Sequence, residues 1–357
     1  MPNQVSPKTP LSNAAVQVKP KVSVSENHSH LGASQPQSAR LKAKLIYNFR
    51  NLLTRPSYFA IFFLARFALV RQLHNFCLRF SSNSATSSTR QTDSLFDLDS
   101  EETVKTLQQD GVCLGLNLPS EFLASLQQYL QTQNCYAGGK PELGFKIADK
   151  ELLDRSFAQP FYVARYFNLS TSCPQVIELA QDPKLLAIAR EYIGHQAQYT
   201  GASLFWTFPI QGVSVDTDQQ MFRHFHYDID DFAGLRFCFY LTDVASEDGS
   251  HVCIRGSHIR KRLRYLLNFF SRIQSAAELT QVYSAEQFIT IAGKSGTGFA
   301  EDTFCFHKGN PPQIQPRLFL QLHFAAHNYH QEQYLDNRDP LSLKNWRENL
   351  SSLAIQK

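Results

Sequence analysis

The sequence predicts a mainly β fold, a sandwich or barrel, with helices that precede it in the chain. After Gly194 the sequence consists of short apolar or alternating runs broken by Gly, Asp and Pro, which is typical of antiparallel sheets. From residue 101 to Gly194, apolar residues recur at helical spacing instead. The 357 residues suffice for one such core, because an all-β domain with its helices takes up to about 250 residues.

Capping residues mark the helix boundaries in the first half of the domain. Ser100 can cap a helix that Gly111 ends, and Pro119 with Ser120 begins the next one. Pro183 interrupts a third helical stretch, because proline clashes with the preceding turn. The expected helices cover residues 100–111, 118–133 and 176–194.

The second half follows the period of a β-strand, in which every other side chain faces the same side. Strands are expected at residues 202–208, 222–229, 235–244, 250–255, 296–300, 303–308 and 317–324. A helical insertion that carries several Arg and Lys residues interrupts them at residues 259–282.

Composition divides the chain into five segments. Residues 1–39 are rich in Ser, Pro and Gln and poor in large apolar residues, so we expect a disordered tail. Residues 40–80 are apolar and basic, which predicts a helical segment, and residues 81–100 have the composition of a linker. The globular domain is expected at residues 101–345, followed by a C-terminal tail at 346–357.

The basic residues are concentrated near the N-terminus. Residues 27–92 contain nine Lys or Arg and no acid, although the net charge of the whole chain is only +4. Without that stretch, 26 basic residues stand against 31 acidic ones, a net charge of −5. The basicity therefore belongs to an N-terminal arm and not to the molecule as a whole.

The 40–80 segment allows two interpretations: a helix that lies on a membrane surface, or a helix packed on the globular domain. Its apolar run at residues 58–70 has 13 residues, against the roughly 20 needed to cross a bilayer. Arginines suit anionic lipid and aromatic residues suit the interface, but packing on the domain fits the same pattern. An organelle transit sequence is a third interpretation.

Cysteine usage and the absence of targeting signals indicate the compartment. The seven cysteines include no CxxC pair, so neither a disulfide framework nor a structural zinc site is indicated. The first 39 residues lack the apolar core of a secretory signal. The sequence also contains no phosphate-binding loop, dinucleotide fingerprint or nucleic-acid module. We expect an intracellular, cytoplasmic protein without a nucleic-acid partner, membrane-peripheral if residues 40–80 contact lipid.

A histidine and an aspartate two residues apart form the most informative motif. In the run FRHFHYDI, His226 and Asp228 project from the same face of the expected strand, and His224 shares that face and could compete as a ligand. One imidazole and one carboxylate, completed by a distant histidine, make the facial triad that holds Fe(II) and leaves positions open. An isolated HxD is common by chance and histidine often has a structural role, so the motif needs context.

His307 and Arg317 supply that context. His307 ends one expected strand, and Arg317 begins the next one ten residues later. Arg317 shares its face with Phe319 and Gln321, and an arginine inside a barrel is costly unless a carboxylate pairs with it. A bound dicarboxylate would supply this partner, because a planar guanidinium binds a carboxylate in bidentate geometry.

Four stretches of the sequence together resemble the phytanoyl-CoA dioxygenase family of Fe(II)- and 2-oxoglutarate-dependent oxygenases. They are DPKLLAIAREYIG, QQMFRHFHYDIDD, LRFCFYLTDVASEDGSHVCIRGSH and EDTFCFHKGNPPQIQPRLFLQLHF. They follow one another in the family's order within residues 101–330. An HxD pair followed 79 residues later by His, and then by Arg at +10, is more specific than any single part.

The resemblance implies a double-stranded β-helix (jelly-roll) core with N-terminal helices packed outside. It implies that His226, Asp228 and His307 bind iron and that Arg317 binds the far carboxylate of 2-oxoglutarate. O2 is then the second co-substrate, and ascorbate an accessory reductant. The expected reaction is hydroxylation of a small or lipid-like organic substrate, and the retained Asp228 disfavours halogenation.

Further residues near the motifs are candidates for the co-substrate site. Gln220, Tyr240 and Thr242 could hydrogen-bond 2-oxoglutarate, although a core or surface role fits them equally well. Gly309 stands where family members often have a hydroxyl residue that assists the arginine. The hydroxyl partner of Arg317 is therefore unassigned.

The remaining histidines are expected outside the metal site. His258 belongs to a GSH motif that has a structural place in the family. The others lack both the upstream strand and the downstream arginine that distinguish His307; they are His251, His323 and His327. We expect them to be ordinary polar positions.

Two other functions fit parts of the sequence. A jelly-roll that keeps the fold without turnover would be a binding or scaffold protein associated with membrane, but such a protein has no need for Arg317 opposite a metal site. A zinc or manganese site of a hydrolase or isomerase would use the same three ligands. O2 consumption coupled to loss of 2-oxoglutarate separates the oxygenase from both.

Overall fold

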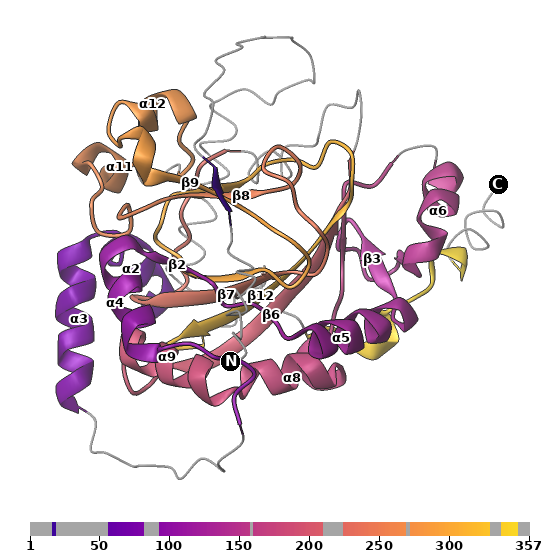
Figure 1. The fold of residues 1–357 in the computed structure, drawn as a ribbon, viewed down its shortest axis with the longest axis horizontal. Coiled ribbons are helices and arrows are strands. Elements are labelled where there is room, and N and C mark those ends of the chain that lie inside the picture. Colours follow the sequence, from indigo (N-terminus) through magenta and orange to yellow (C-terminus); the bar gives the residue numbers. More distant parts are fainter. Residues whose placement is uncertain are drawn as a thin grey trace, which may run out of the picture.

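Two antiparallel sheets face each other and form the core of the fold (Figure 1). The computed structural model describes residues 16–18, 56–81, 93–157, 160–209, 224–268, 272–328 and 337–348. In the large sheet the strand order is β2 (Val112–Leu114), β10 (Gly298–Asp302), β7 (Gly234–Tyr240), β12 (Arg317–Ala325), β6 (Gln198–Thr207), β5 (Val163–Arg165), β3 (Cys135–Ala137) and β4 (Gly144–Phe145). In the small sheet it is β1 (Val16–Val18), β9 (Phe288–Ala292), β8 (His251–Ile254) and β11 (His307–Gly309). This is the predicted double-stranded β-helix.

Strand alternation decides which side chains enter the space between the sheets. In β7, Leu235, Phe237 and Phe239 face the helices outside, whereas Cys238 and Tyr240 join the core between the sheets. The small sheet contributes residues such as Cys253, Ile289 and Ile291 to that same core. The interior is therefore lined by alternate residues of both sheets.

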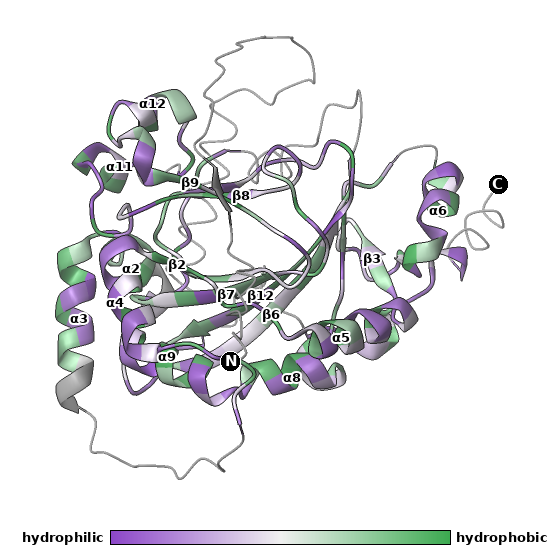
Figure 2. Cartoon of the chain, viewed as in Figure 1, coloured by the Kyte–Doolittle hydropathy of each residue, from purple (hydrophilic) through white to green (hydrophobic). Residues whose placement is uncertain are grey.

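Helices cover the outer face of the large sheet (Figure 1), and Figure 2 shows hydrophobic and hydrophilic residues alternating along them. The predicted helices are present as α4 (Ser100–Asp110), α5 (Ser120–Thr132), α8 (Pro174–Ala180) and α9 (Pro183–Ile193). Further helical turns are α6 (Lys150–Phe157), α7 (Leu169–Ser172), η1 (Ile147–Asp149), η3 (Ala285–Gln287) and η5 (Pro340–Ser342). The N-cap of α4 is Asp99, one residue before the predicted Ser100, because the Asp99 carboxylate accepts the N–H groups of Glu101 and Glu102.

Some predicted strands differ in the structure. His307 begins β11 instead of ending a strand at 303–308, because the Asp302 carboxylate accepts the N–H of Phe304 and closes a turn. In 222–229, the described residues 224–229 make only single bridges, to Gln274 and to His307. The insertion at 259–282 contains two short helices, α11 (Leu263–Leu267) and α12 (Ala276–Thr280).

The described part of the 40–80 segment packs on the domain as α2 (Pro56–Leu64) and α3 (Ala68–Ser81). Ile61 and Ala65 are buried in a cluster with Phe225 and Tyr227, which flank His226. At the corner between the helices Arg71 is buried; it donates to the carbonyls of Ala65, Arg66 and His258 and lies over the ring of Phe304. No helix in the described ranges is long and apolar enough to cross a bilayer.

The other expected segment boundaries stay predictions, and most of residues 1–55, 82–92 and 349–357 lie outside the described residues. Within the described ranges, Phe96 is buried against the helices, and Ser94 donates to Asp182. At the other end, Trp346 is buried in the same cluster. Packed structure thus extends somewhat beyond residues 101–345 at both ends.

Candidate active site

Backbone pairing brings the two metal-ligand segments together. The N–H of His226 donates to the carbonyl of His307 at 2.9 Å, and the N–H of His307 donates back at 2.8 Å. Two residues later, the N–H of Asp228 donates to the carbonyl of Thr303 at 2.8 Å. Because side chains two apart in extended backbone share a side, His226 and Asp228 both face His307.

The three predicted ligands form a buried cluster. One donor atom from each of His226, Asp228 and His307 lies within 4.8 Å of the others. The Nδ1 of His226 is 2.9 Å from the carbonyl oxygen of His224, and the Nδ1 of His307 is 3.0 Å from that of Cys305. Each Nδ1 therefore carries the proton, which leaves both Nε2 lone pairs for a metal ion.

The electrostatic state of the cluster suits a divalent cation. Burial, together with the neighbouring His307, lowers the pKa of His226 to about 3, so that its imidazole is neutral at pH 7. Burial alone would raise the pKa of Asp228, but Arg236 and the two histidines together bring this pKa well below its usual range. One carboxylate and two imidazoles are the donor set of a non-haem Fe(II) centre.

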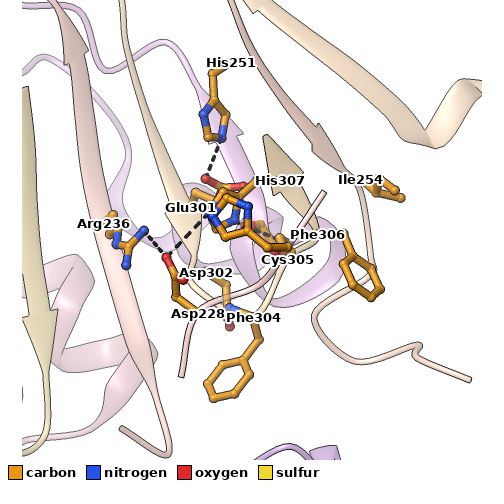
Figure 3. A network of polar contacts seen from close by, with 12 residues as sticks. Asp228, Arg236, His251, Ile254, Glu301, Asp302, Phe304, Cys305, Phe306 and His307 are labelled. Atoms are coloured by element: carbon orange, nitrogen blue, oxygen red, sulfur yellow. Dashed lines mark hydrogen bonds and ion pairs between the residues drawn. The ribbon is translucent and has the colours of Figure 1, made fainter. Parts of the chain in front are cut away.

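Arg236 on β7 joins the cluster through Asp228 (Figure 3). Its Nη1 is 2.7 Å from Oδ2 of Asp228, its Nη2 is 3.0 Å from Oδ2 of Asp230, and its Nε donates to Nδ1 of His323. The Nε2 of His307 is 3.6 Å from the same Asp228 oxygen. The arginine thus fixes the orientation of Asp228 and compensates its charge.

A second carboxylate lies on the other side of His307. Glu301 of β10 is 2% exposed; its Oε2 is 2.8 Å from Nε2 of His251, and its Oε1 is 3.8 Å from Nδ1 of His307 (Figure 3). The ring of His251 stacks on that of His307 at 5.5 Å. Burial raises the pKa of Glu301 to about 7 and lowers that of His251 to about 3. His251 and Glu301 therefore pack against the imidazole of His307 and restrict its orientation.

Arg317 lies in the same interior, at the start of β12. Its guanidinium is 5.1 Å from the ring of Phe319, and that ring is 6.2 Å from the ring of His251. Its Nη1 donates to the carbonyl of Gly249 at 2.6 Å, and its Nη2 donates to Oγ1 of Thr207 at 3.2 Å. Gly249 has a φ of +83°, a conformation that favours glycine and brings its backbone against the arginine.

The surroundings of Arg317 fit an anionic ligand. The side chain is 7% exposed, and its Nε is buried without a hydrogen-bond partner among the described residues. Within the described ranges, no ion pair joins Arg317 to a carboxylate. A buried guanidinium without an anion is unfavourable, so this site is suited to a carboxylate that is not part of the described protein.

The remaining candidates have different positions. Gln220 lies outside the described residues. The hydroxyl of Tyr240 donates to the carbonyl of Ile291 and accepts the N–H of His251, so it joins the sheets. The Oγ1 of Thr242 accepts the N–H of Leu318, next to Arg317. The backbone thus uses both hydroxyls, and their part in co-substrate binding stays a prediction.

Two of the histidines that were expected outside the metal site are buried beside it. His251 and His323 are both buried beside the cluster, each in contact with a charged partner. By contrast, His224 is exposed, and the Nε2 of His258 lies 3.2 Å from the carbonyl oxygen of Gln108. His251 and His323 lie outside the three-residue cluster, as expected, but they are buried and not ordinary polar positions, which spacing alone could not reveal.

Sequence reasoning also missed three residues around the site: Arg236, Glu301 and Thr207. Arg236 lies on the same strand face as Cys238 and Tyr240. A buried arginine needs a partner, and this argument, which identified Arg317, would also have identified Arg236. Glu301 alternates in the same way with Phe299. Thr207 is the hydroxyl neighbour that the sequence left unassigned, and the pairing of β6 with β12 places it opposite Arg317.

No protein-family model matches the chain, and no curated protein matches it either. The resemblance to the phytanoyl-CoA dioxygenase family therefore stays a prediction.

Several solved structures are similar to part of the chain. AviO1 from Streptomyces viridochromogenes Tue57 is 15% identical over 64% of this chain and 96% of its own, with a TM-score of 0.41. The non-heme α-ketoglutarate-dependent epimerase SnoN from nogalamycin biosynthesis is 12% identical over 63% of this chain and 82% of its own, with a TM-score of 0.42. HygX from Streptomyces hygroscopicus, solved with nickel and 2-oxoglutarate bound, is 17% identical over 63% of this chain and 86% of its own, also with a TM-score of 0.42.

Proposed function

We propose that the protein is a non-haem Fe(II)- and 2-oxoglutarate-dependent dioxygenase that hydroxylates a small or lipid-like organic substrate. The observation that carries the proposal is the combination of two features in one interior. A buried cluster of His226, Asp228 and His307 offers a metal its donor atoms, and a buried Arg317 lacks a carboxylate among the described residues. A ligand that has one carboxylate for the arginine and further oxygens for the metal satisfies both.

The donor set fits iron, and the arginine fits 2-oxoglutarate. When bound, Fe(II) with 2-oxoglutarate and O2 supplies the oxidising power for hydroxylation, with release of CO2 and succinate, and ascorbate can keep the metal reduced. The protein's own residues bind and orient these groups. Asp228 supplies the anionic ligand, held by Arg236, while Thr207 and Gly249 hold the guanidinium of Arg317 in place.

Buried aromatic side chains surround Arg317 and His251 in the interior. The rings of Tyr240 and Phe319 lie 5.2 Å apart, and that of Phe299 is 6.1 Å from Phe319. All three are at most 2% exposed. A dry site strengthens the electrostatic attraction of Arg317 for a carboxylate, which favours a tightly held co-substrate.

The test is binding followed by turnover in the full-length protein. Fe(II) and 2-oxoglutarate, added without O2, should give the visible charge-transfer band of their chelate, and admitting O2 should convert 2-oxoglutarate to succinate. His226→Ala should abolish the band, because it removes one donor. His224→Ala is the matched control, since that side chain is exposed, and it should behave as wild type. Wild-type protein that binds neither Fe(II) nor 2-oxoglutarate would overturn the proposal.

One observation favours a second candidate, a jelly-roll binding or scaffold protein without turnover. Arg236 already pairs with Asp228 at 2.7 Å, so the carboxylate has a cationic partner before any metal binds. A protein that had lost its metal would need such a partner to keep a buried carboxylate stable. Succinate formation rules this candidate out, whereas metal-free protein of full stability that binds neither ligand supports it.

A further inference from the structure

The outward side of α3 carries large apolar residues. Leu69, Leu73 and Phe76 are 74%, 65% and 58% exposed. They are four and three residues apart, so they lie along one face of the helix. Figure 2 shows hydrophobic and hydrophilic residues along α3, which stands at the outer edge of the molecule. Burial of three such side chains against an apolar partner would lower the free energy, because apolar surface is removed from water.

The opposite side of α3 is fixed to the domain. Arg71 is 6% exposed, and its guanidinium lies 3.9 Å from the centre of the Phe304 ring. One turn later, the ring of His74 stacks on that of Phe232 at 4.1 Å. The orientation of the helix is therefore set by contacts on its inner side. Because Arg71 and His74 hold the inner side of α3 against the domain, the three apolar residues on its other side point away from the domain.

The exposed apolar residues continue onto α11, which flanks the same corner. Arg66 donates to the carbonyl of Asn268, and Arg71 donates to that of His258, so both ends of the α11 segment are bonded to the corner of α2 and α3. Between these two anchor points, Leu263 and Leu267 are 62% and 50% exposed. The two helices thus present their apolar residues at one edge of the molecule. We call the five residues the apolar edge: Leu69, Leu73, Phe76, Leu263 and Leu267.

Basic residues accompany the apolar edge. Arg260, Arg262 and Arg264 are exposed on and beside α11. In the sequence, residues 27–92 contain nine basic residues and no acid, although the rest of the chain has a net charge of −5; two of the nine, Arg66 and Arg71, are buried. Exposed arginines therefore adjoin the exposed apolar side chains of α11.

We propose that the apolar edge binds the surface of an anionic lipid bilayer. Apolar side chains on a helix that lies flat enter the boundary between headgroups and acyl chains, and each nearby Lys or Arg adds attraction to anionic lipid. A polar partner protein would not need the apolar face, and a second copy of this chain would bring like charges together. The proposal does not depend on the dioxygenase chemistry.

The helix that leads into α3 lies beside the candidate metal site. Phe62 of α2 lies 5.7 Å from the guanidinium of Arg272, and Arg272 is 3.9 Å from Asp228. α2, the helix before α3, therefore packs beside the segment that contains Asp228.

The test is co-sedimentation of the full-length protein with vesicles. Wild type should bind vesicles of phosphatidylcholine and phosphatidylserine, bind pure phosphatidylcholine much more weakly, and lose affinity as salt is raised. The variant Leu69→Gln/Leu73→Gln/Phe76→Gln should lose more than ~10-fold in affinity, since glutamine keeps the helix but removes the apolar surface. Arg260→Gln/Arg262→Gln/Arg264→Gln should remove most of the preference for anionic lipid.

A matched control changes three exposed apolar residues elsewhere in the molecule. Leu152, Ile314 and Leu341 are 47%, 75% and 86% exposed, and the corresponding triple Gln variant should bind vesicles as wild type does. Should the α3 variant fail to fold, Leu69→Gln alone takes its place. Wild type that ignores both vesicle types, or an α3 variant that binds normally, would overturn the proposal. So would an α3 variant that only converts a wild-type dimer into a monomer.

Discussion

Arg236 and Arg317 lie on adjacent strands and face the same interior, yet their surroundings differ. Arg236 pairs with two carboxylates of the protein, whereas the hydrogen bonds of Arg317 go to a carbonyl and a hydroxyl. Two identical side chains therefore have different tasks. One compensates the charge of Asp228, and the other is suited to a ligand from solution.

Arg317→Ala should weaken the binding of 2-oxoglutarate by more than ~10-fold, because a buried bidentate pair is worth upwards of about 1.4 kcal/mol. Thr207→Val should weaken it less, since it removes only the hydroxyl that orients the guanidinium. Both effects can be measured by titrating 2-oxoglutarate into Fe(II)-loaded protein. Arg347→Ala, at an exposed position, is the control. Unchanged affinity in Arg317→Ala would mean that 2-oxoglutarate binds elsewhere.

Arg236→Met should destabilise the metal-free protein more than the metal-loaded protein. Without Arg236, Asp228 and Asp230 lose their closest cationic partner, and removing one partner of a buried ion pair costs about 3–5 kcal/mol of unfolding free energy. A bound divalent cation compensates Asp228 instead, so part of the loss is recovered. Urea unfolding with and without metal measures the difference. An equal loss in both states would show that the ion pair and the metal do not share Asp228.

At the scale of elements, the segment that carries the metal ligands is held from both sides. His226 and Asp228 face the interior. The residues that alternate with them pack outward with Ile61 of α2; they are Phe225, Tyr227 and Ile229. The N-terminal helices are thus part of the wall behind the metal site. Their detachment should disturb the site without touching a ligand.

Arg71→Met should loosen α3 from the domain. The side chain bonds three carbonyls and lies over an aromatic ring, and a methionine of similar length keeps the packing but loses these bonds, at a cost of about 2–3 kcal/mol. Limited proteolysis should then cut within residues 56–92 faster than in wild type. Gln72→Met, an exposed neighbour, is the control, and equal cutting of all three proteins would contradict the proposed anchoring role.

Asp248 gives the loop before β12 a pH-dependent stability. Partial burial would raise the pKa of Asp248, but its carboxylate accepts the N–H groups of Gln313, Ile314 and Gln315, and the pKa is lowered overall. A lowered folded-state pKa stabilises the fold above the unfolded-state value, about 4, and this contribution disappears as the pH falls below it. Thermal unfolding of Asp248→Asn should therefore differ from wild type at pH 7 and approach it near about pH 3. A difference that persists in acid would exclude the ionised carboxylate as the cause.

At the scale of the whole molecule, the site connects the two sheets. His307 belongs to the small sheet, Arg236 and Arg317 belong to the large sheet, and the metal segment bridges to β11. A ligand that binds both the His–Asp–His cluster and Arg317 stabilises the native state only, and therefore raises the unfolding temperature by mass action.

Fe(II) with 2-oxoglutarate should raise the thermal unfolding temperature of the full-length protein. At ligand concentrations 100-fold above Kd, the free energy of unfolding increases by about 2.7 kcal/mol. A chelator should reverse the shift, because the co-substrate needs the metal as its second anchor. Asp228→Ala should show no shift with metal. If 2-oxoglutarate alone raised the unfolding temperature and a chelator did not reverse this rise, the co-substrate would bind without the metal, which would contradict the prediction.

The sequence by itself determined the fold class and the residues that meet at the metal cluster. Alternation put His226 and Asp228 on one face, and the spacing from His307 to Arg317 marked the second segment; the structure brings all three ligands together. Both signals are local, since they depend only on neighbouring residues along a strand. The helices were predictable for the same reason, apart from a shift of one residue at Asp99.

Only the tertiary structure decided what surrounds these residues. The partners Arg236, Glu301 and Thr207 come from strands that spacing cannot pair, because the register between distant strands depends on how the whole barrel closes. The position of residues 56–81 was equally undetermined, since an apolar basic helix suits both a domain and a membrane. The structure packs Arg71 inward and leaves Leu69 and Leu73 outside, so one helix uses its two faces differently.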